Sequence, residues 1–284
     1  MSNERPEPSF VIIGAAKAAT TWLQSNLRRD QRVFMPGPEI HFFSREYDKG
    51  WDWYLKHFKE ASPGQLVGEK SNSYLDAPDA AERLHQHLPN ARLIVQIRNP
   101  VDRAYSDYCM LFRRGEVSGK IDDYFNGNQF ESNRFYEGGR YFAHINRFLE
   151  LFPKDRLLIT LYNQIAEDPE SLIDEVGTFL GVPDINDGVV IQERVKDKRR
   201  PMLPKPLQYV AHSIAPIIKP IRHKPWVEKT RALLAREIRY PPLPPTVEER
   251  LKDFFAADIE ALSGITDKPV GNWLTDQPKR HASR

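Results

Sequence analysis

The stretch that decides the fold is Phe10-Val-Ile-Ile-Gly14-Ala-Ala-Lys17-Ala-Ala-Thr20-Thr21-Trp22-Leu23. A short apolar run leads into a turn of small residues, and a lysine, two threonines and a helical pattern follow. Successive backbone N–H groups and a helix start can hold a phosphate in such a turn. The loop is not that of a nucleoside triphosphatase, G-x-x-x-x-G-K-[ST], because Lys17 follows Gly14 by only three residues. We therefore predict an anion site of a different kind.

A second stretch runs from Arg92 to Tyr108 and predicts a strand, a turn and a helix. The strand ends in Arg98, and Asp102 is expected to cap the helix that carries Ser106. A magnesium-dependent kinase would place a carboxylate at such a strand end, whereas a guanidinium suits a second phosphate. Two anion sites at neighbouring strand ends indicate a bis-phosphorylated nucleotide.

The hydrophobic pattern predicts an α/β fold, with a P-loop-like parallel β-sheet flanked by helices on both faces. One domain covering residues 1–284 is expected, because this length suffices for a single large core. The expected strands are Phe10–Gly14, Leu66–Glu69, Leu93–Arg98 and Leu157–Leu161, and the expected helices include Ala77–Leu88, Tyr141–Phe152 and Glu248–Leu262. Ligands of such sheets bind beyond the carboxyl ends of the strands. Lys17, Lys70 and Arg98 are therefore expected around one pocket.

The overall composition gives few hints about partners. Lys and Arg number 41 against 39 Asp and Glu, so bulk charge does not favour nucleic acid as a partner. The single cysteine, Cys109, excludes an intramolecular disulfide and fits a reducing compartment. The polar N-terminus and the lack of a long apolar run lead us to expect a cytoplasmic protein.

The segment 194–240 is basic and rich in proline, and we expect it to form a lid or to wrap the domain. Within it, residues 205–224 combine apolar and basic side chains. They could rest on an anionic membrane, or form a basic rim for a polyanionic glycan.

Four motifs in this order resemble those of sulfotransferases that use 3′-phosphoadenosine 5′-phosphosulfate (PAPS). They are Lys17-Ala-Ala-Thr-Thr-Trp, Pro38-Glu39-Ile-His41-Phe-Phe43, Glu69-Lys70-Ser71 and Arg98-Asn-Pro-Val-Asp-Arg-Ala-Tyr-Ser106-Asp-Tyr. The resemblance is strongest to the heparan sulfate N- and O-sulfotransferases and their bacterial relatives. It implies PAPS as donor, adenosine 3′,5′-bisphosphate as product and no metal.

The resemblance also implies roles near the transferred group. Lys17 would stabilise the leaving phosphate, with hydroxyl and N–H groups from the run Ala18, Ala19, Thr20 and Thr21. Glu39 would be the general base, Lys70 a second active-site lysine, and His41 a competing base or an acceptor-site residue. The structural alternatives are that the threonines merely cap a helix and that Lys70 pairs with Glu69 or with a helix end.

For the nucleotide itself, the resemblance implies that Arg98 and Ser106 hold the 3′-phosphate, helped by Arg199 or Arg200. Trp22 would stack on adenine, or else be a core residue. The alternative for Arg98 is an ion pair with Asp102. Two departures from the family pattern are notable, since glycines are usual where Ala18 and Ala19 stand, and a lysine is common in place of Pro38.

The implied reaction moves a sulfuryl group, by in-line transfer, to a hydroxyl or amine of a glycan, a glycolipid, a glycosylated metabolite or another small-molecule acceptor. A P-loop-type small-molecule kinase and a non-catalytic anion- or glycan-binding protein are the alternatives. The sequence leaves open the acceptor, the choice between O- and N-sulfation, and the oligomeric state.

Overall fold

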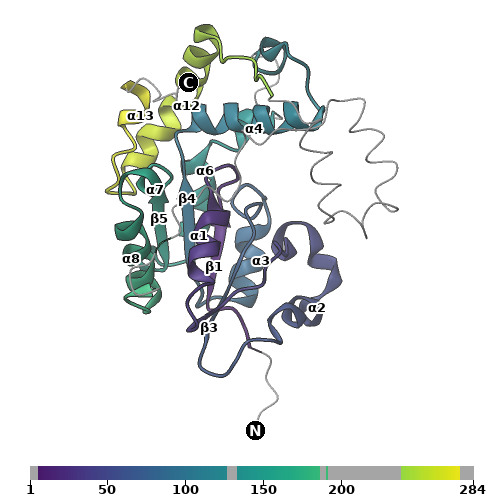
Figure 1. Ribbon diagram of the computed structural model, residues 1–284, viewed down its shortest axis with the longest axis vertical. Helices are drawn as coiled ribbons and strands as arrows, with labels where there is room; N and C mark the ends of the chain where they lie inside the picture. Colours follow the sequence, from purple (N-terminus) through teal and green to yellow (C-terminus); the bar gives the residue numbers. More distant parts are fainter. Residues whose placement is uncertain (1–5, 127–132, 186–189, 191–237, 276–284) are drawn as a thin grey trace, which may run out of the picture.

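The computed structural model describes residues 6–126, 133–185, 190 and 238–275. At its centre is a five-stranded parallel sheet with the strand order β2-β3-β1-β4-β5 (Figure 1). The strands are β1 (Phe10–Gly14), β2 (Val33–Phe34), β3 (Leu66–Lys70), β4 (Arg92–Ile97) and β5 (Leu157–Leu161). The connection from β3 to β4 carries the chain from one half of the sheet to the other, so the strand order reverses between the neighbours β1 and β4. Ligands of open α/β sheets bind at such a point.

The described helices include α1 (Thr20–Leu27), α2 (Trp51–Leu55), α3 (Ala80–His87), α4 (Pro100–Arg114), α5 (Arg134–Glu137), α6 (Tyr141–Leu149), α7 (Gln164–Glu167), α8 (Pro169–Leu180), α12 (Pro245–Ser263) and α13 (Asn272–Thr275). A π-helical turn covers Phe42–Glu46. Short 3-10 turns cover Tyr47–Lys49, Lys56–Phe58, Ile121–Tyr124 and Lys154–Arg156.

Alternating residues of β1 contact helices on opposite faces of the sheet. Phe10 and Ile12 belong to a buried cluster with residues of α1 and α8. Val11 and Ile13 belong to a second cluster with residues of α3 and α6. Because side chains of a strand alternate between faces, a strand covered on both sides is apolar throughout. The predicted fold class, a parallel sheet with helices on both faces, is confirmed.

A third buried cluster joins α4 to α12, which lies more than a hundred residues later in the chain. Tyr108 of α4 packs in this cluster with Leu251 and Phe255 of α12. The carboxylate of Asp258 in α12 also accepts hydrogen bonds from the first turn of α6, from Phe142 N at 2.9 Å and Ala143 N at 3.1 Å. These contacts fix α12 against both α4 and α6 (Figure 1).

Several sequence predictions need correction. The helix after β4 is capped by Asn99, not Asp102, and the Asn99 side chain accepts from Val101 N at 3.0 Å. Strand β2 was missed, because two residues are too few to show an alternating pattern. Residues 194–237 of the predicted lid, and with them the segment 205–224, lie outside the described residues. Among the helices that the structure describes, none combines the length and apolar character that a membrane span requires.

Candidate active site

The loop after β1 lies across the end of β4 and is fixed to it by two hydrogen bonds. Ala15 N donates to the carbonyl of Gln96 at 2.8 Å, and the Gln96 side-chain amide donates to the carbonyl of Ala18. Lys17 and Ala19 adopt left-handed backbone conformations, with φ of 72° and 65°. The loop is thus compact and bound to the sheet at the position predicted for an anion site.

The first two residues of α1 do not cap the helix, the alternative that we considered for them. The N-cap position is Ala19, which has no side chain to cap the helix, so the cap interpretation of Thr20 and Thr21 is wrong. Thr20 is buried. Thr21 Oγ1 instead accepts a hydrogen bond from Lys70 Nζ at 3.3 Å, which connects the start of α1 to the end of β3.

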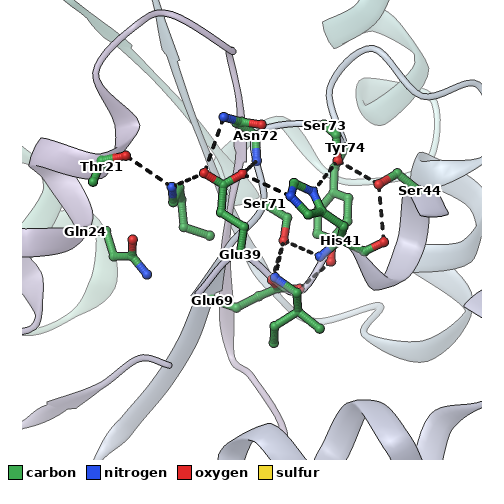
Figure 2. A network of polar contacts seen from close by, with 12 residues as sticks. Thr21, Gln24, Glu39, His41, Ser44, Glu69, Ser71, Asn72, Ser73 and Tyr74 are labelled. Atoms are coloured by element: carbon green, nitrogen blue, oxygen red, sulfur yellow. Dashed lines mark hydrogen bonds and ion pairs between the residues drawn. The ribbon is translucent and has the colours of Figure 1, made fainter. Parts of the chain in front are cut away.

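Lys70 and Glu39 form the central ion pair of the site (Figure 2). Lys70 Nζ lies 2.5 Å from Glu39 Oε1, and the lysine side chain is only 2% exposed against 18% for the glutamate. An ammonium so deeply buried needs a counter-charge. The alternative that Lys70 pairs with Glu69 is therefore wrong. Two predicted catalytic groups, 31 residues apart in the chain, are in direct contact.

Glu39 is held by further donors from the turn after β3. Asn72 donates to it twice, from its backbone N to Oε2 at 3.3 Å and from Nδ2 to Oε1 at 3.4 Å. His41 Nε2 lies 3.5 Å from Glu39 Oε2. Burial lowers the pKa of His41, an effect that the nearby Glu39 carboxylate partly opposes. A neutral imidazole beside a carboxylate is the expected state at neutral pH.

His41 is oriented by a short chain of hydroxyl groups. Its Nδ1 lies 2.7 Å from Ser73 Oγ, which in turn lies 2.7 Å from Ser44 Oγ. Figure 2 shows His41 between this pair of serines and Glu39. The structure thus brings together Glu39, the predicted base, and His41, the residue that we considered as an alternative base. The imidazole lies next to the carboxylate, and the serine hydroxyl fixes its orientation.

A second carboxyl group, Glu69, lies next to this site but is completely buried. Its Oε1 accepts from the hydroxyls of Tyr54 at 2.9 Å and Tyr74 at 2.7 Å, and its Oε2 accepts from Ser71 Oγ at 2.8 Å. Burial raises the pKa of Glu69 from 4.5 to about 7, although the three hydrogen bonds act in the opposite direction.

Arg98 follows the last residue of β4, as predicted, and lies at the same edge of the sheet as the first loop. Its guanidinium stacks on the ring of Tyr162 at 4.4 Å and lies 3.6 Å from the Asp102 carboxylate. The ion pair with Asp102 that we considered as an alternative is therefore present. This ion pair does not use every N–H donor of the guanidinium, because the buried Nε of Arg98 has no hydrogen-bond partner among the described residues.

The remaining predicted residues have mixed outcomes. Ser106 lies on α4, one turn beyond Asp102, and is half-buried. Trp22 is 2% exposed and packs in the cluster beneath α1 and α8. This burial agrees with the core alternative and argues against the stacking of adenine on Trp22. Arg199 and Arg200 lie outside the described residues.

Two groups of this site were missed in the sequence. Asn72 follows Lys70 by two residues, and Tyr162 directly follows β5. Both lie just beyond the carboxyl end of a strand, which is the signal that could have identified them. Within the part of the chain that the structure describes, no three His, Cys, Asp or Glu side chains gather as a metal site would require.

Comparison with known proteins identifies the family of this chain. Residues 7–202 match the family described as "Sulfotransferase domain". The chain is 32% identical over 189 residues to mouse heparan sulfate glucosamine 3-O-sulfotransferase 6, covering 62% of this chain and 52% of that protein. It is 30% identical over 198 residues to the bifunctional heparan sulfate N-deacetylase/N-sulfotransferase 1 of Caenorhabditis briggsae, covering 62% and 23%.

The chain therefore spans about half, or less, of the length of these relatives. Its fold matches the crystal structure of a sulfotransferase from Alicyclobacillus acidocaldarius with a TM-score of 0.65, at 23% identity over 94% of this chain and 99% of that one. The resemblance inferred from the four motifs is confirmed, and the chain belongs to the sulfotransferase domain family.

Proposed function

We propose that this chain is a PAPS-dependent sulfotransferase that moves a sulfuryl group to a hydroxyl or amine of a glycan. The observation that carries the proposal is the contact of Lys70 with both Thr21 and Glu39. This one ammonium joins the start of the helix after the anion loop to the carboxylate predicted to be the base. A donor held by the loop and an acceptor beside Glu39 would therefore meet at Lys70.

The described residues fit a nucleotide that carries two separate phosphate groups. The loop from Gly14 to Ala19 lies beyond β1, and Arg98 lies beyond the neighbouring strand β4. The Nε of Arg98 is a buried donor without a hydrogen-bond partner in the described part of the chain, and it is suited to an anion. The stacked ring of Tyr162 holds the guanidinium in place. Arg98 would hold the 3′-phosphate, and Lys17 would lie at the 5′ end.

In the proposed sulfuryl transfer, each of these residues has a separate role. When bound, PAPS supplies an activated sulfuryl group. Glu39 would take the proton from the acceptor hydroxyl, a poor nucleophile until it is deprotonated. Lys70 and Asn72 orient the Glu39 carboxylate, and Lys17 would offset negative charge on the leaving phosphate.

The acceptor class rests on the names of the relatives. One is a heparan sulfate glucosamine 3-O-sulfotransferase, and another is a heparan sulfate N-deacetylase/N-sulfotransferase. A sugar hydroxyl or amine is thus the acceptor that we propose. Both demand a base close to the acceptor atom, a role that the partly exposed Glu39 can fill.

A transfer assay with radiolabelled PAPS and a set of desulfated glycans tests this proposal. We expect label in the glycan fraction with the wild type and none with Glu39→Gln, which keeps the shape of the side chain but is no base. Isothermal titration with adenosine 3′,5′-bisphosphate should give micromolar affinity for both proteins (about 1 μM, or roughly −8 kcal/mol). Transfer by Glu39→Gln at the wild-type rate, or tight binding of ATP in place of the bisphosphate, would refute it.

A further inference from the structure

The segment 35–41, which carries the proposed base Glu39, is held in place by side chains from other parts of the chain. Residues 35–41 form neither helix nor strand, so no ladder of backbone hydrogen bonds fixes Glu39. Instead, side chains bind this segment at two points. The Gln24 amide of α1 donates to the carbonyls of Pro36 at 2.8 Å and Gly37 at 3.4 Å.

The second point of support lies immediately after Glu39. The hydroxyl of Ser71 accepts hydrogen bonds from the backbone N of Ile40 at 3.2 Å and of His41 at 2.9 Å. A serine hydroxyl has two acceptor sites and one proton to donate. Both acceptor sites of Ser71 are therefore used to hold the backbone between the proposed base and its neighbouring histidine.

The single proton of Ser71 is directed by Glu69. Ser71 Oγ donates to Glu69 Oε2, while the hydroxyls of Tyr54 and Tyr74 hold Glu69 Oε1. The Glu69 side chain cannot relocate, since it is completely buried and has these three partners. Because its proton is donated to Glu69, the Ser71 hydroxyl must present its lone pairs to the Ile40 and His41 N–H groups. Figure 2 shows Ser71 between Glu69 and His41.

The end of β3 thus holds Glu39 in two ways. Successive side chains along a strand point to opposite faces. Lys70 contacts the side chain of Glu39, whereas Ser71 binds the backbone that follows Glu39. Glu69 contacts this segment only through Ser71, whose hydroxyl it orients. Three consecutive residues set the position of one carboxylate.

We propose that Glu69 and Ser71 are positioning residues for sulfuryl transfer, acting together to fix the backbone that carries Glu39 and His41. This inference rests on the proposed function. It is separate from the roles of Lys70 and Glu39, because neither Glu69 nor Ser71 needs to touch donor or acceptor.

The test measures transfer per nucleotide-binding site. Adenosine 3′,5′-bisphosphate titration counts the competent sites in each preparation, and the radiolabel assay then gives kcat per site and the acceptor KM. For Ser71→Ala we expect kcat to fall about tenfold or more, since small displacements of a catalytic group have large effects on rate. The acceptor KM and the bisphosphate Kd should change less than about threefold. Ser71→Thr, which keeps the hydroxyl, should restore most of the rate.

Glu69→Gln provides a second variant, and Ser62→Ala, at an exposed serine, provides the control. We expect Glu69→Gln to lower kcat per site, because the amide no longer offers two acceptor oxygens to three hydroxyls. A merely structural role would reduce the number of competent sites and leave the rate per site unchanged. That result for Ser71→Ala, or a Ser71→Thr variant as slow as Ser71→Ala, would overturn the inference while leaving the proposed function intact. A wild type that transfers no sulfuryl group would overturn both.

Discussion

Replacing Glu69 with glutamine should change how the stability of the protein depends on pH. Burial raises the pKa of Glu69 in the folded protein from 4.5 to about 7, so the folded state binds this proton more tightly than the unfolded state. A carboxyl with a raised folded-state pKa contributes stability that is complete below about pH 4.5 and is lost as the pH rises to about 7. Glutamine does not titrate, so the variant does not lose stability in this way as the pH rises.

The structure gives the size of the effect. The two pKa values of Glu69, 4.5 and about 7, differ by about 2.5. At about 1.4 kcal/mol for each pKa unit, the whole loss is about 3.5 kcal/mol. Because Glu69 is completely buried, solvent does not screen the interaction. Relative to the wild type, Glu69→Gln should therefore gain about 3 kcal/mol in free energy of unfolding between about pH 5 and about pH 8.

Urea denaturation of both proteins across this pH range measures the difference. Comparing pH values for one variant removes any constant cost of exchanging a carboxyl for an amide in the hydrogen-bond network. Glu60→Gln is a matched control, since it makes the same chemical change at an exposed position. A difference between Glu69→Gln and wild type that stays constant with pH, or that moves against the variant at high pH, would refute the reasoning.

Three further predictions concern the loop and the proposed ligand contacts. Ala19→Gly should raise the free energy of unfolding by about 1 kcal/mol in urea denaturation, because Ala19 has φ 65°; a less stable variant would contradict this. Arg98→Lys should weaken adenosine 3′,5′-bisphosphate binding about tenfold in calorimetry, since the fork of donors and the ring stacking are lost, whereas the exposed control Arg29→Ala should bind normally. Lys70→Met should lower radiolabel transfer at least about 100-fold per binding site, and a rate within about twofold of wild type would exclude its role.

The sequence predicted those parts of the site that follow from local order along the chain. An apolar run, a small-residue turn and a helical pattern were enough to place β1, the loop that follows it and α1, and the same logic placed Arg98 at the end of β4. It also identified Glu39 and Lys70 as candidates, through a motif resemblance. Where local signals competed, the prediction was wrong. Asp102 does not cap the helix, because Asn99, directly before α4, accepts hydrogen bonds from the first N–H groups itself.

Only the tertiary structure decided which of these residues act on each other. Nothing in the sequence around Glu69 shows that it is buried under two tyrosines from different segments, or that Lys70 turns away from it to pair with Glu39. Trp22 likewise became a core residue only once α8 packed against α1. Local order fixes the path of the backbone because it depends on near neighbours, whereas contacts and burial depend on residues that only the packed chain brings together.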